Sequence, residues 1–308
     1  MTATITLGHT DIALAPLGIG TMSWGTTRAM AYGGSDSAQA EQGALAASLD
    51  AGVTLVDTAE MYRNERRVGE LVRGHAEIVL ATKYAPWAYR RKASVLPALD
   101  RSLERLGVDH VDLYQVHMPP QLMSIPTLMH ELAHAHQDKR IRAIGVSNFN
   151  ERQLRTAHAT LADAGIALAA NQVQYSLLHR KPEINGVADA CRELGVTLIA
   201  YMPLASGALT GKYGPAQRPT GVRRVFPTFR GSTLQAARPL LDLLSQIAKD
   251  HDATPAQVAL RWLIHHDAVP IPGAKNADQA KANAHALHIT LDQTEVDALD
   301  AASLPWRR

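Results

Sequence analysis

Asp57, Tyr62, Lys83 and His117 are four residues whose side chains could together move a proton. Asp57, Lys83 and His117 each end an apolar run that is typical of a buried strand, and Tyr62 follows shortly after the first of them. A carboxylate at the mouth of a buried strand needs a cation, because an unpaired buried charge is very costly, and Lys83 is the candidate. We therefore expect the four side chains to converge where neighbouring strands end.

General acid catalysis is the chemistry that these residue types suit. An unperturbed tyrosine has a pKa near ~10, and a close positive charge such as that of Lys83 lowers it by ~1–3 units. A buried lysine tends to lose its proton, so Asp57 is needed to keep it charged. If His117 orients a carbonyl oxygen or assists the transfer, Tyr62 can protonate that oxygen as it becomes an alkoxide, which is worth ~10²–10⁴ in rate. Taken alone, Asp57 would more often be a cap or turn residue.

The elements that must position these residues alternate regularly along the chain. Strands are predicted at residues 17–22, 53–56, 78–83, 111–116, 141–146, 167–173, 196–201 and 269–272. Helices are predicted at residues 37–50, 65–72, 93–106, 126–137, 151–164, 183–194, 234–250, 255–265, 277–287 and 293–301. Eight such strand–helix units predict an α/β fold whose parallel sheet closes into a (β/α)₈ TIM barrel, with the chemistry at the C-terminal ends of the strands.

A single barrel domain over residues 1–308 is expected, because no change of composition marks a linker. Residues 5–12 predict an N-terminal β-hairpin, and the last two predicted helices extend beyond the eighth strand. A doubly wound open sheet is the structural alternative. It is less favoured because no Gly-x-Gly-x-x-Gly fingerprint opens the chain and polar residues recur at the strand ends.

Composition and charge argue against several classes of partner. Of the 308 residues 46% are hydrophobic, enough for a large core, and the formal net charge of +2 is too near neutral to favour nucleic acid or an anionic membrane. No apolar run approaches the ~18 residues that a membrane helix needs, and the N-terminus lacks a secretion signal. The single cysteine, Cys191, cannot form an internal disulfide. We expect a soluble cytoplasmic protein.

Three loops, at residues 23–37, 84–92 and 214–232, are expected to shape the substrate pocket, and the last lies within a longer departure from the alternation at residues 203–233. The segment of residues 203–233 is rich in glycine and basic residues and is a candidate lid or ligand clamp. The candidate substrate-contacting residues are Trp24, Trp87, Tyr89, Met118 and Arg224. No metal site is predicted, because the closely spaced histidine pairs do not share a helix face.

Several sequence pieces, in order and at matching spacing, resemble the aldo-keto reductase superfamily from about Thr6 to Leu304. The matching pieces are LGIGTM (17–22), DTAEMY (57–62), ATK (81–83), VDLYQVH (111–117), GVSNF (145–149), NQVQY (171–175), PLASGALTGKY (203–213) and IPGAK (271–275). The sequence from residue 171 to residue 213 is similar to that of a bacterial and plant-chloroplast branch of the family, whose substrates are largely unassigned.

The resemblance implies a barrel that binds a nicotinamide cofactor without a Rossmann fold. It makes Tyr62 the proton donor, Lys83 and Asp57 the residues that tune it, and His117 the residue that positions the carbonyl. The residues that fall where the family holds the nicotinamide are Ser147, Asn148, Gln172 and, by stacking, Tyr201. Those that match the pyrophosphate loop are Leu204, Ser206, Gly207, Leu209 and Lys212, and those at the adenosine end are Gly273, Lys275, Gln279 and Asn283.

Lys275 is the expected contact to a 2′-phosphate, because a phosphate calls for a point cation or an arginine fork, and this favours NADPH over NADH. Two positions depart from the family pattern in the site. Arg63 stands where the family commonly has glycine, and Met202 replaces a frequent serine.

These observations predict an NADPH-dependent reductase that converts an aldehyde or ketone into an alcohol, with Tyr62 as proton donor and a small carbonyl compound as substrate. A nucleotide-sensing regulatory module similar to potassium-channel β subunits is one alternative. NADP-dependent alcohol oxidation is another, because the same proton relay runs both ways. The physiological substrate and the oligomeric state are not predicted.

Overall fold

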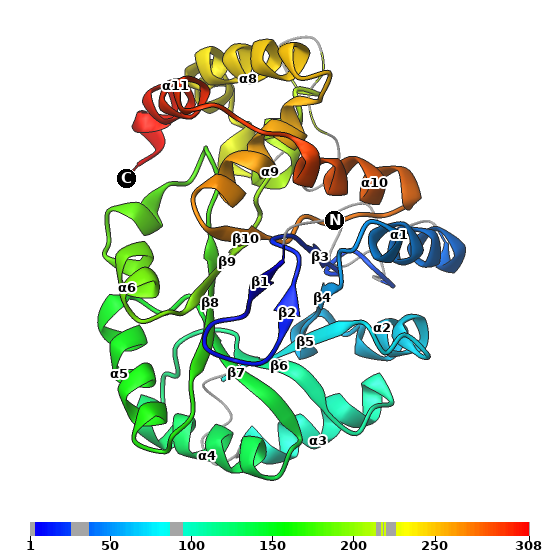
Figure 1. Cartoon of the computed structure of the whole chain (residues 1–308), viewed down its shortest axis with the longest axis vertical. Coiled ribbons are helices and arrows are strands. Elements are labelled where there is room, and N and C mark those ends of the chain that lie inside the picture. The colour runs from blue at the N-terminus through cyan, green and yellow to red at the C-terminus, as the bar shows by residue number, and fades with distance from the viewer. Residues whose placement is uncertain are drawn as a thin grey trace.

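The computed structural model describes residues 4–25, 37–86, 95–213, 217, 219 and 226–307. Eight parallel strands form one sheet in the order β10-β9-β8-β7-β6-β5-β4-β3, which confirms the predicted barrel (Figure 1). The strands are β3 (Gly18–Gly20), β4 (Leu55–Asp57), β5 (Val79–Tyr84), β6 (Val111–Val116), β7 (Ile141–Ser147), β8 (Leu168–Gln174), β9 (Thr197–Tyr201) and β10 (Ala268–Pro270).

The barrel closes between the first and last strands of the sheet. Gly20 forms a parallel bridge with Gly273, and its backbone N–H donates to the carbonyl oxygen of Pro272 at 3.0 Å. A Cβ atom at position 20 would lie 2.9 Å from the carbonyl oxygen of Ile271. Glycine is therefore needed there for the two chain segments to approach each other.

Helices surround the sheet on its outer side (Figure 1). The α-helices are α1 (Ala38–Asp50), α2 (Glu65–Val72), α3 (Val95–Leu106), α4 (Ile125–Gln137), α5 (Glu151–Ala162), α6 (Val187–Glu193), α7 (Gly231–Ala236), α8 (Arg238–Asp250), α9 (Pro255–His265), α10 (Ala277–His285) and α11 (Gln293–Ser303). Short 3₁₀ helices are η2 (Glu60–Tyr62), η3 (Lys181–Glu183), η4 (Ala205–Thr210), η6 (Pro227–Phe229), η7 (Ala286–His288) and η8 (Leu304–Trp306). No described helix is long and apolar enough to cross a membrane.

The predicted N-terminal hairpin is present and closes one end of the barrel. Its strands are β1 (Ile5–Thr6) and β2 (Ala13–Leu14), which pair antiparallel. The buried side chains of Leu7, Ile12 and Leu14 join the apolar cluster that fills the barrel interior. In Figure 1 the hairpin crosses the middle of the barrel. The chemistry-bearing strand ends are therefore at the other end of the barrel.

Two helices that the sequence pattern predicts as continuous are interrupted. Residues 183–194 contain α6 only from Val187, because Gly186 lies in the left-handed region with φ 77°. Residues 234–250 are divided between α7 and α8, and Pro239 in the first turn of α8 has no N–H to donate to the preceding turn. Neither interruption touches the strand ends that carry the predicted site.

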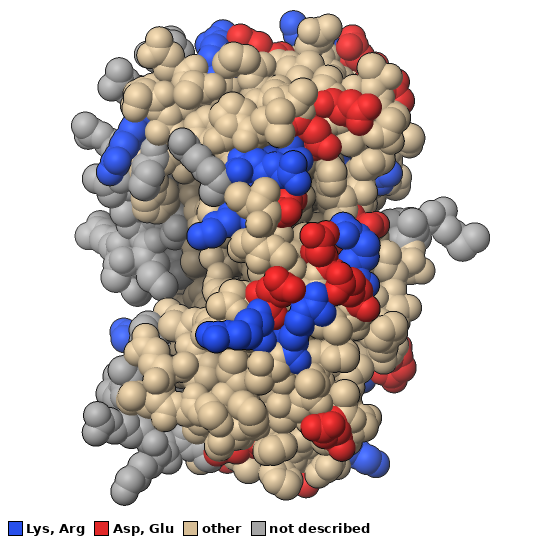
Figure 2. Space-filling model, turned by 90° about the vertical axis from the view of Figure 1, so that its left-hand side faces the viewer, with Lys and Arg blue, Asp and Glu red and all other residues tan. Residues whose placement is uncertain are grey.

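Charges of both signs are mixed on the molecular surface. Figure 2 shows this on the side where α5 and α6 lie in Figure 1, with blue and red side chains next to each other. Arg155 of α5 illustrates the mixing, because it pairs with Glu151 on its own helix and with Glu193 of α6. The described residues on this face therefore form no extended patch of one sign.

Candidate active site

A cavity of about 540 Å³ lies at the C-terminal ends of the strands. Three of the four predicted catalytic residues line it, namely Asp57, Tyr62 and His117. The fourth, Lys83, is fully buried directly behind it, 2.5 Å from Asp57. The structure thus brings together the four residues that the sequence pattern singles out.

Lys83 is held at the centre of this group by three different neighbours. Its Nζ atom donates to Asp57 Oδ1 at 2.5 Å and to the backbone carbonyl of Thr58 at 2.8 Å. An ammonium group carries three N–H donors, and the third is left for Tyr62, whose ring centroid lies 5.1 Å from Nζ. The lysine therefore connects the buried carboxylate to the phenol.

The electrostatics of Lys83 favour its charged form. Burial by itself would lower the pKa of this lysine, but the charge of Asp57 and the interaction with Tyr62 raise the pKa above its ordinary value. A positively charged Lys83 stabilises a phenolate at Tyr62. The arrangement is thus suited to a tyrosine that gives up a proton.

His117 packs edge-to-face against Tyr62 as a neutral ring at the cavity. Burial and the positive charge of Lys83 lower the pKa of His117 to about 3. The two aromatic rings are 5.7 Å apart and nearly perpendicular, at 83°. His117 Nδ1 is buried without a hydrogen-bond partner among the described residues. A neutral imidazole at this position can direct an N–H group towards a substrate oxygen.

A network of short hydrogen bonds fixes the turn that presents Tyr62. The Thr58 hydroxyl donates to Asn64 Oδ1 at 2.8 Å, and Asn64 Nδ2 donates to the carbonyl oxygen of Thr21 at 2.7 Å. Arg63 ends η2 in the left-handed conformation with φ 57°. This explains why glycine is common in the family at that position, and it shows that an arginine can adopt the same turn.

The residues predicted to hold the nicotinamide gather beside the catalytic group. Ser147, Asn148, Gln172 and Tyr201 all line the cavity. Asn148 Nδ2 donates to the carbonyl oxygen of His117 at 3.1 Å, and the Tyr201 hydroxyl donates to Asn148 Oδ1 at 3.0 Å. Burial and the proximity of Tyr62 raise the pKa of Tyr201, so this second phenol stays protonated.

The predicted pyrophosphate loop is only partly at the cavity. Leu204 and Ser206 line it, whereas the Leu209 side chain is fully buried in the core and Lys212 is exposed outside the lining. Ser206 and Gly207 both have positive φ, 59° and 100°, which turns the backbone sharply here. Ser206 Oγ is buried with no hydrogen-bond partner among the described residues. This orphaned hydroxyl fits a polar ligand group such as a phosphate oxygen.

The predicted adenosine end lies between β10 and α10. Gly273, Lys275 and Gln279 line the cavity, and Gln279 Oε1 accepts from the backbone N–H of Lys275 at 3.0 Å. Asn283 does not line the cavity, but its Nδ2 lies 3.4 Å from the carbonyl oxygen of Gly273. Lys275 lies next to the N-terminus of α10, and a positive charge at a helix N-terminus favours binding of an anionic group.

Only one of the predicted substrate-contacting residues that the structure describes lies at the cavity. Met118 lines the cavity, and so do Met22, Met61 and Met202, which were not predicted as substrate contacts. Trp24 does not line it, because its indole is fully buried and donates to the carbonyl oxygen of Ala274 at 2.7 Å. Trp87, Tyr89 and Arg224 lie outside the described residues.

Sequence reasoning missed Gln115. This fully buried residue of β6 donates from Nε2 to Asp57 Oδ2 at 3.1 Å, next to Gln172, which donates to the same oxygen at 3.0 Å. Gln115 precedes His117 by two positions, so strand alternation places both on the inner face of the barrel. That spacing was the signal that could have identified it.

The comparison with protein families decides the identity of the barrel. A model of the Aldo/keto reductase family matches residues 16–304. The chain belongs to this family. Membership makes the protein an oxidoreductase that acts on a small carbonyl compound and uses a nicotinamide cofactor.

Curated relatives are similar over most of their length. The chain is 34% identical to the chloroplastic pyridoxal reductase of Arabidopsis thaliana, over 95% of this chain and 84% of that protein. It is 38% identical to an uncharacterized oxidoreductase of Mycobacterium tuberculosis, over 94% and 90% respectively. An aldo-keto reductase of Schizosaccharomyces pombe, named with NADP(+), is 33% identical over 87% of this chain and 84% of its own.

Solved structures show the same architecture. A thermostable aldo-keto reductase in complex with the inhibitor epalrestat superposes with a TM-score of 0.77 at 28% identity, covering 97% of this chain and 99% of its own. The glycerol dehydrogenase of Gluconobacter oxydans superposes with a TM-score of 0.84 at 25% identity, covering 97% of this chain and 94% of its own.

Proposed function

We propose that this protein reduces an aldehyde or ketone to the alcohol with NADPH, and that Tyr62 donates the proton. The observation that carries the proposal is the fully buried Lys83, bonded to Asp57 at 2.5 Å and placed against Tyr62 at the wall of the cavity. A buried, paired lysine beside a tyrosine has a clear chemical use, because it lowers the cost of removing the phenolic proton.

Tyr62 and His117 would hold the substrate oxygen between them. As negative charge develops on that oxygen, the Tyr62 hydroxyl transfers its proton and Lys83 stabilises the phenolate that remains. His117 is neutral, since its pKa is about 3, and stabilises the developing charge by hydrogen bonding. Proton transfer from a positioned side chain is worth about 10²–10⁴ in rate.

The other lining residues would hold the cofactor. Bound nicotinamide supplies the hydride that adds to the carbonyl carbon. Ser147, Asn148 and Gln172 would bind its carboxamide, and Tyr201 would lie against one face of the ring, leaving only one face open to the substrate. Lys275 would pair with the 2′-phosphate of NADPH, in keeping with the NADP(+) in the name of the Schizosaccharomyces pombe relative.

The decisive experiment is Tyr62→Phe, assayed by NADPH oxidation with a panel of aldehydes and ketones. Pyridoxal belongs in the panel because a relative 34% identical to this chain is named for it. We expect turnover to fall by about 10²–10⁴ while NADPH affinity is kept, because only the acid is removed. Tyr175→Phe is the matched control, since it removes a phenol hydroxyl that binds Glu183 away from the cavity.

Two outcomes would contradict the proposal. Equal turnover in wild type and Tyr62→Phe would remove the role of Tyr62. Tight NADPH binding without reduction of any compound in the panel would instead favour the nucleotide-sensing alternative. Assaying NADP⁺ with a panel of alcohols, including glycerol, tests the reverse direction.

A further inference from the structure

We infer that Gln115 is a positioning residue for Asp57 and thereby sets the acidity of Tyr62. The inference rests on the proposed function, because it concerns the group that hands over the proton. Gln115 is fully buried and does not line the cavity, so it acts through its neighbours and not through contact with the substrate or cofactor.

The contacts of Asp57 show how this positioning would work. Oδ1 accepts from Lys83, and Oδ2 accepts from both Gln115 and Gln172, at 3.1 and 3.0 Å. A carboxylate can only accept, so both glutamines must present their NH₂ groups to it. Bonds on both oxygens prevent the carboxylate from rotating, and Oδ1 stays directed at the ammonium group.

The strand register places Gln115 for this contact. In the β5–β6 pairing Gln115 lies opposite Lys83, and in the β6–β7 pairing it lies opposite Gly145. A Cβ atom at position 145 would lie 2.8 Å from Cγ of Gln115. The backbone of Gly145 does not have positive φ, so glycine is required here for the space that the glutamine occupies.

The same bonds link Asp57 to the cofactor side of the cavity. Gln172 Nε2 also lies 3.2 Å from Gln115 Oε1, so both of its N–H groups are directed inward. What Gln172 can offer the cavity is its carbonyl oxygen, an acceptor for an amide N–H. Gln115 therefore fixes Asp57 on one side and the orientation of Gln172 on the other.

Gln115→Met tests the inference, because methionine fills a similar volume without a donor. Losing one hydrogen bond to a charged group should lower kcat about tenfold. The substrate KM should change less than about twofold, because Gln115 does not line the cavity. The pH at which Tyr62 ionises should rise by about half a unit or more, because part of the free energy of the lost hydrogen bond reaches Tyr62 through Asp57 and Lys83.

Tyr62 ionisation is best followed directly, by NMR of protein labelled with carbon-13 at the tyrosine Cζ. The Tyr62 signal is assigned from the spectrum of Tyr62→Phe. A merely structural role for Gln115 would lower the fraction of protein that binds NADPH and leave the ionisation of the folded remainder unchanged. That result, or an unchanged kcat per NADPH-binding site, would overturn the inference.

Gly145→Ala provides an independent variant that leaves Gln115 in the sequence. The added methyl group would displace the glutamine side chain, so kcat and the Tyr62 ionisation should shift in the same direction as in Gln115→Met. If Gln115→Met does not fold, the result for Gly145→Ala alone tests the inference. If wild type reduces no carbonyl compound, the proposed function fails, whereas the NMR titration still tests the connection from Gln115 to Tyr62.

Discussion

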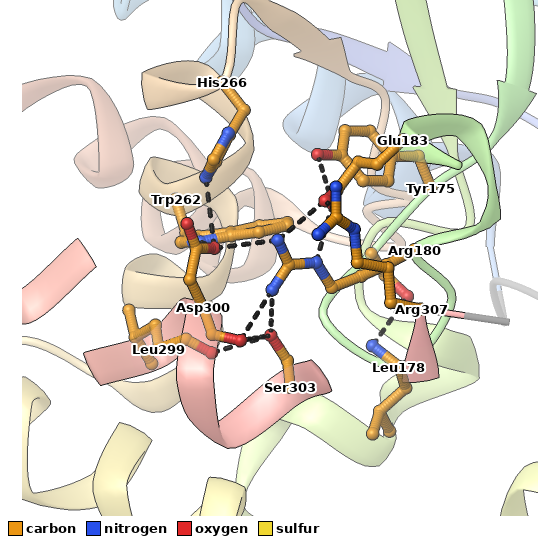
Figure 3. Close-up of polar contacts among 11 residues, drawn as sticks. Tyr175, Leu178, Arg180, Glu183, Trp262, His266, Leu299, Asp300, Ser303 and Arg307 are labelled. Atoms are coloured by element: carbon orange, nitrogen blue, oxygen red, sulfur yellow. Dashed lines mark hydrogen bonds and ion pairs between the residues drawn. The ribbon is translucent and has the colours of Figure 1, made fainter. Parts of the chain in front are cut away.

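Lys83 and Arg180 each lie at the centre of a buried cluster of charged side chains, and only one of these two clusters has the character of an active site. The first is the group around Lys83 at the cavity. The second surrounds Arg180, which precedes η3, and connects it to α9 and α11 (Figure 3). Both bury a cation against carboxylates, so burial of charge does not distinguish them.

Arg180 directs all its hydrogen bonding into the protein. Its Nε and one terminal nitrogen bind the two carboxylate oxygens of Glu183 at 2.6 and 2.7 Å. The other terminal nitrogen donates to the Ser303 hydroxyl at 2.6 Å and to the Asp300 carbonyl at 2.8 Å. The Trp262 ring lies 5.0 Å from the guanidinium carbon. This cluster joins the last helix to the barrel.

The difference lies in what is left for a ligand. A second cavity, of about 390 Å³, borders Glu183 and His266 of the Arg180 cluster, and both have charged neighbours. Glu183 accepts hydrogen bonds from Arg180 and Tyr175, and His266 Nε2 lies 3.3 Å from Asp300 Oδ1. At the first cavity, by contrast, His117 Nδ1 and Ser206 Oγ are buried without hydrogen-bond partners among the described residues. Of these two clusters, the one at Lys83 therefore leaves polar atoms beside the cavity for a ligand, whereas the one at Arg180 pairs its charged groups with one another.

Replacing the cation in the first cluster should have the largest effect. We expect Lys83→Met to lower turnover by about 10²–10⁴, because Tyr62 loses its neighbouring charge. Its free energy of unfolding should fall by about 3–5 kcal/mol, because Asp57 is left buried without a cation. In the double variant Asp57→Asn, Lys83→Met, urea unfolding should show recovered stability while turnover stays low. Recovery of both would mean that Lys83 serves the fold alone.

The corresponding change in the second cluster should affect only stability. Arg180→Met leaves Glu183 and Asp300 without their shared partner, and we expect a loss of about 3–5 kcal/mol in urea unfolding. Turnover per NADPH-binding site should stay within about twofold of wild type, because Arg180 does not line the cavity. A large fall in turnover with unchanged stability would overturn the distinction between the clusters.

The neutral His117 predicts a specific pH dependence of stability. Its pKa is lowered from 6.5 to about 3 in the folded protein, so the unfolded chain binds the extra proton between these values. The resulting contribution to stability is complete above pH 6.5 and is lost as the pH falls towards 3. The free energy of unfolding of His117→Gln should therefore fall less steeply between pH 6.5 and pH 4 than that of wild type. Equal slopes would show that His117 is not held neutral.

The smallest effect is expected from Tyr175→Phe. The Tyr175 hydroxyl donates to Glu183 at 3.0 Å, and its loss should lower the free energy of unfolding by about 1 kcal/mol. Turnover should not change, because Tyr175 does not line the first cavity. A change in turnover beyond about twofold would mean that the Arg180 cluster is coupled to the active site.

Strand ends were the best predicted part of the molecule. A polar residue stands at the end of several apolar runs, and in a parallel barrel the C-terminal ends of all strands lie at the same rim. The sequence alone was therefore enough to predict that Asp57, Lys83 and His117 lie close together. The positions of β6 and α2 were also predicted correctly, at residues 111–116 and 65–72.

Contacts that depend on register or loop conformation could not be predicted. Strand alternation places Gln115 on the inner face of the barrel with His117, but its contact with Asp57 also depends on the offset at which β5 and β6 pair. Leu209 was assigned to the cofactor loop, and its side chain is buried in the core after a turn in which Ser206 and Gly207 have positive φ. Trp24 follows the first barrel strand, yet its indole is used in a contact with Ala274.

The joint between β3 and β10, where the backbone of Gly20 pairs with residues 272 and 273, couples the two ends of the chain. Met22 and Ser23, just after β3, line the same cavity as Lys275 and Gln279, which follow β10. A molecule held by both groups spans the joint and fastens segments that are about 250 residues apart in the sequence. Occupancy of the cavity and integrity of the barrel wall are therefore thermodynamically linked, and each strengthens the other.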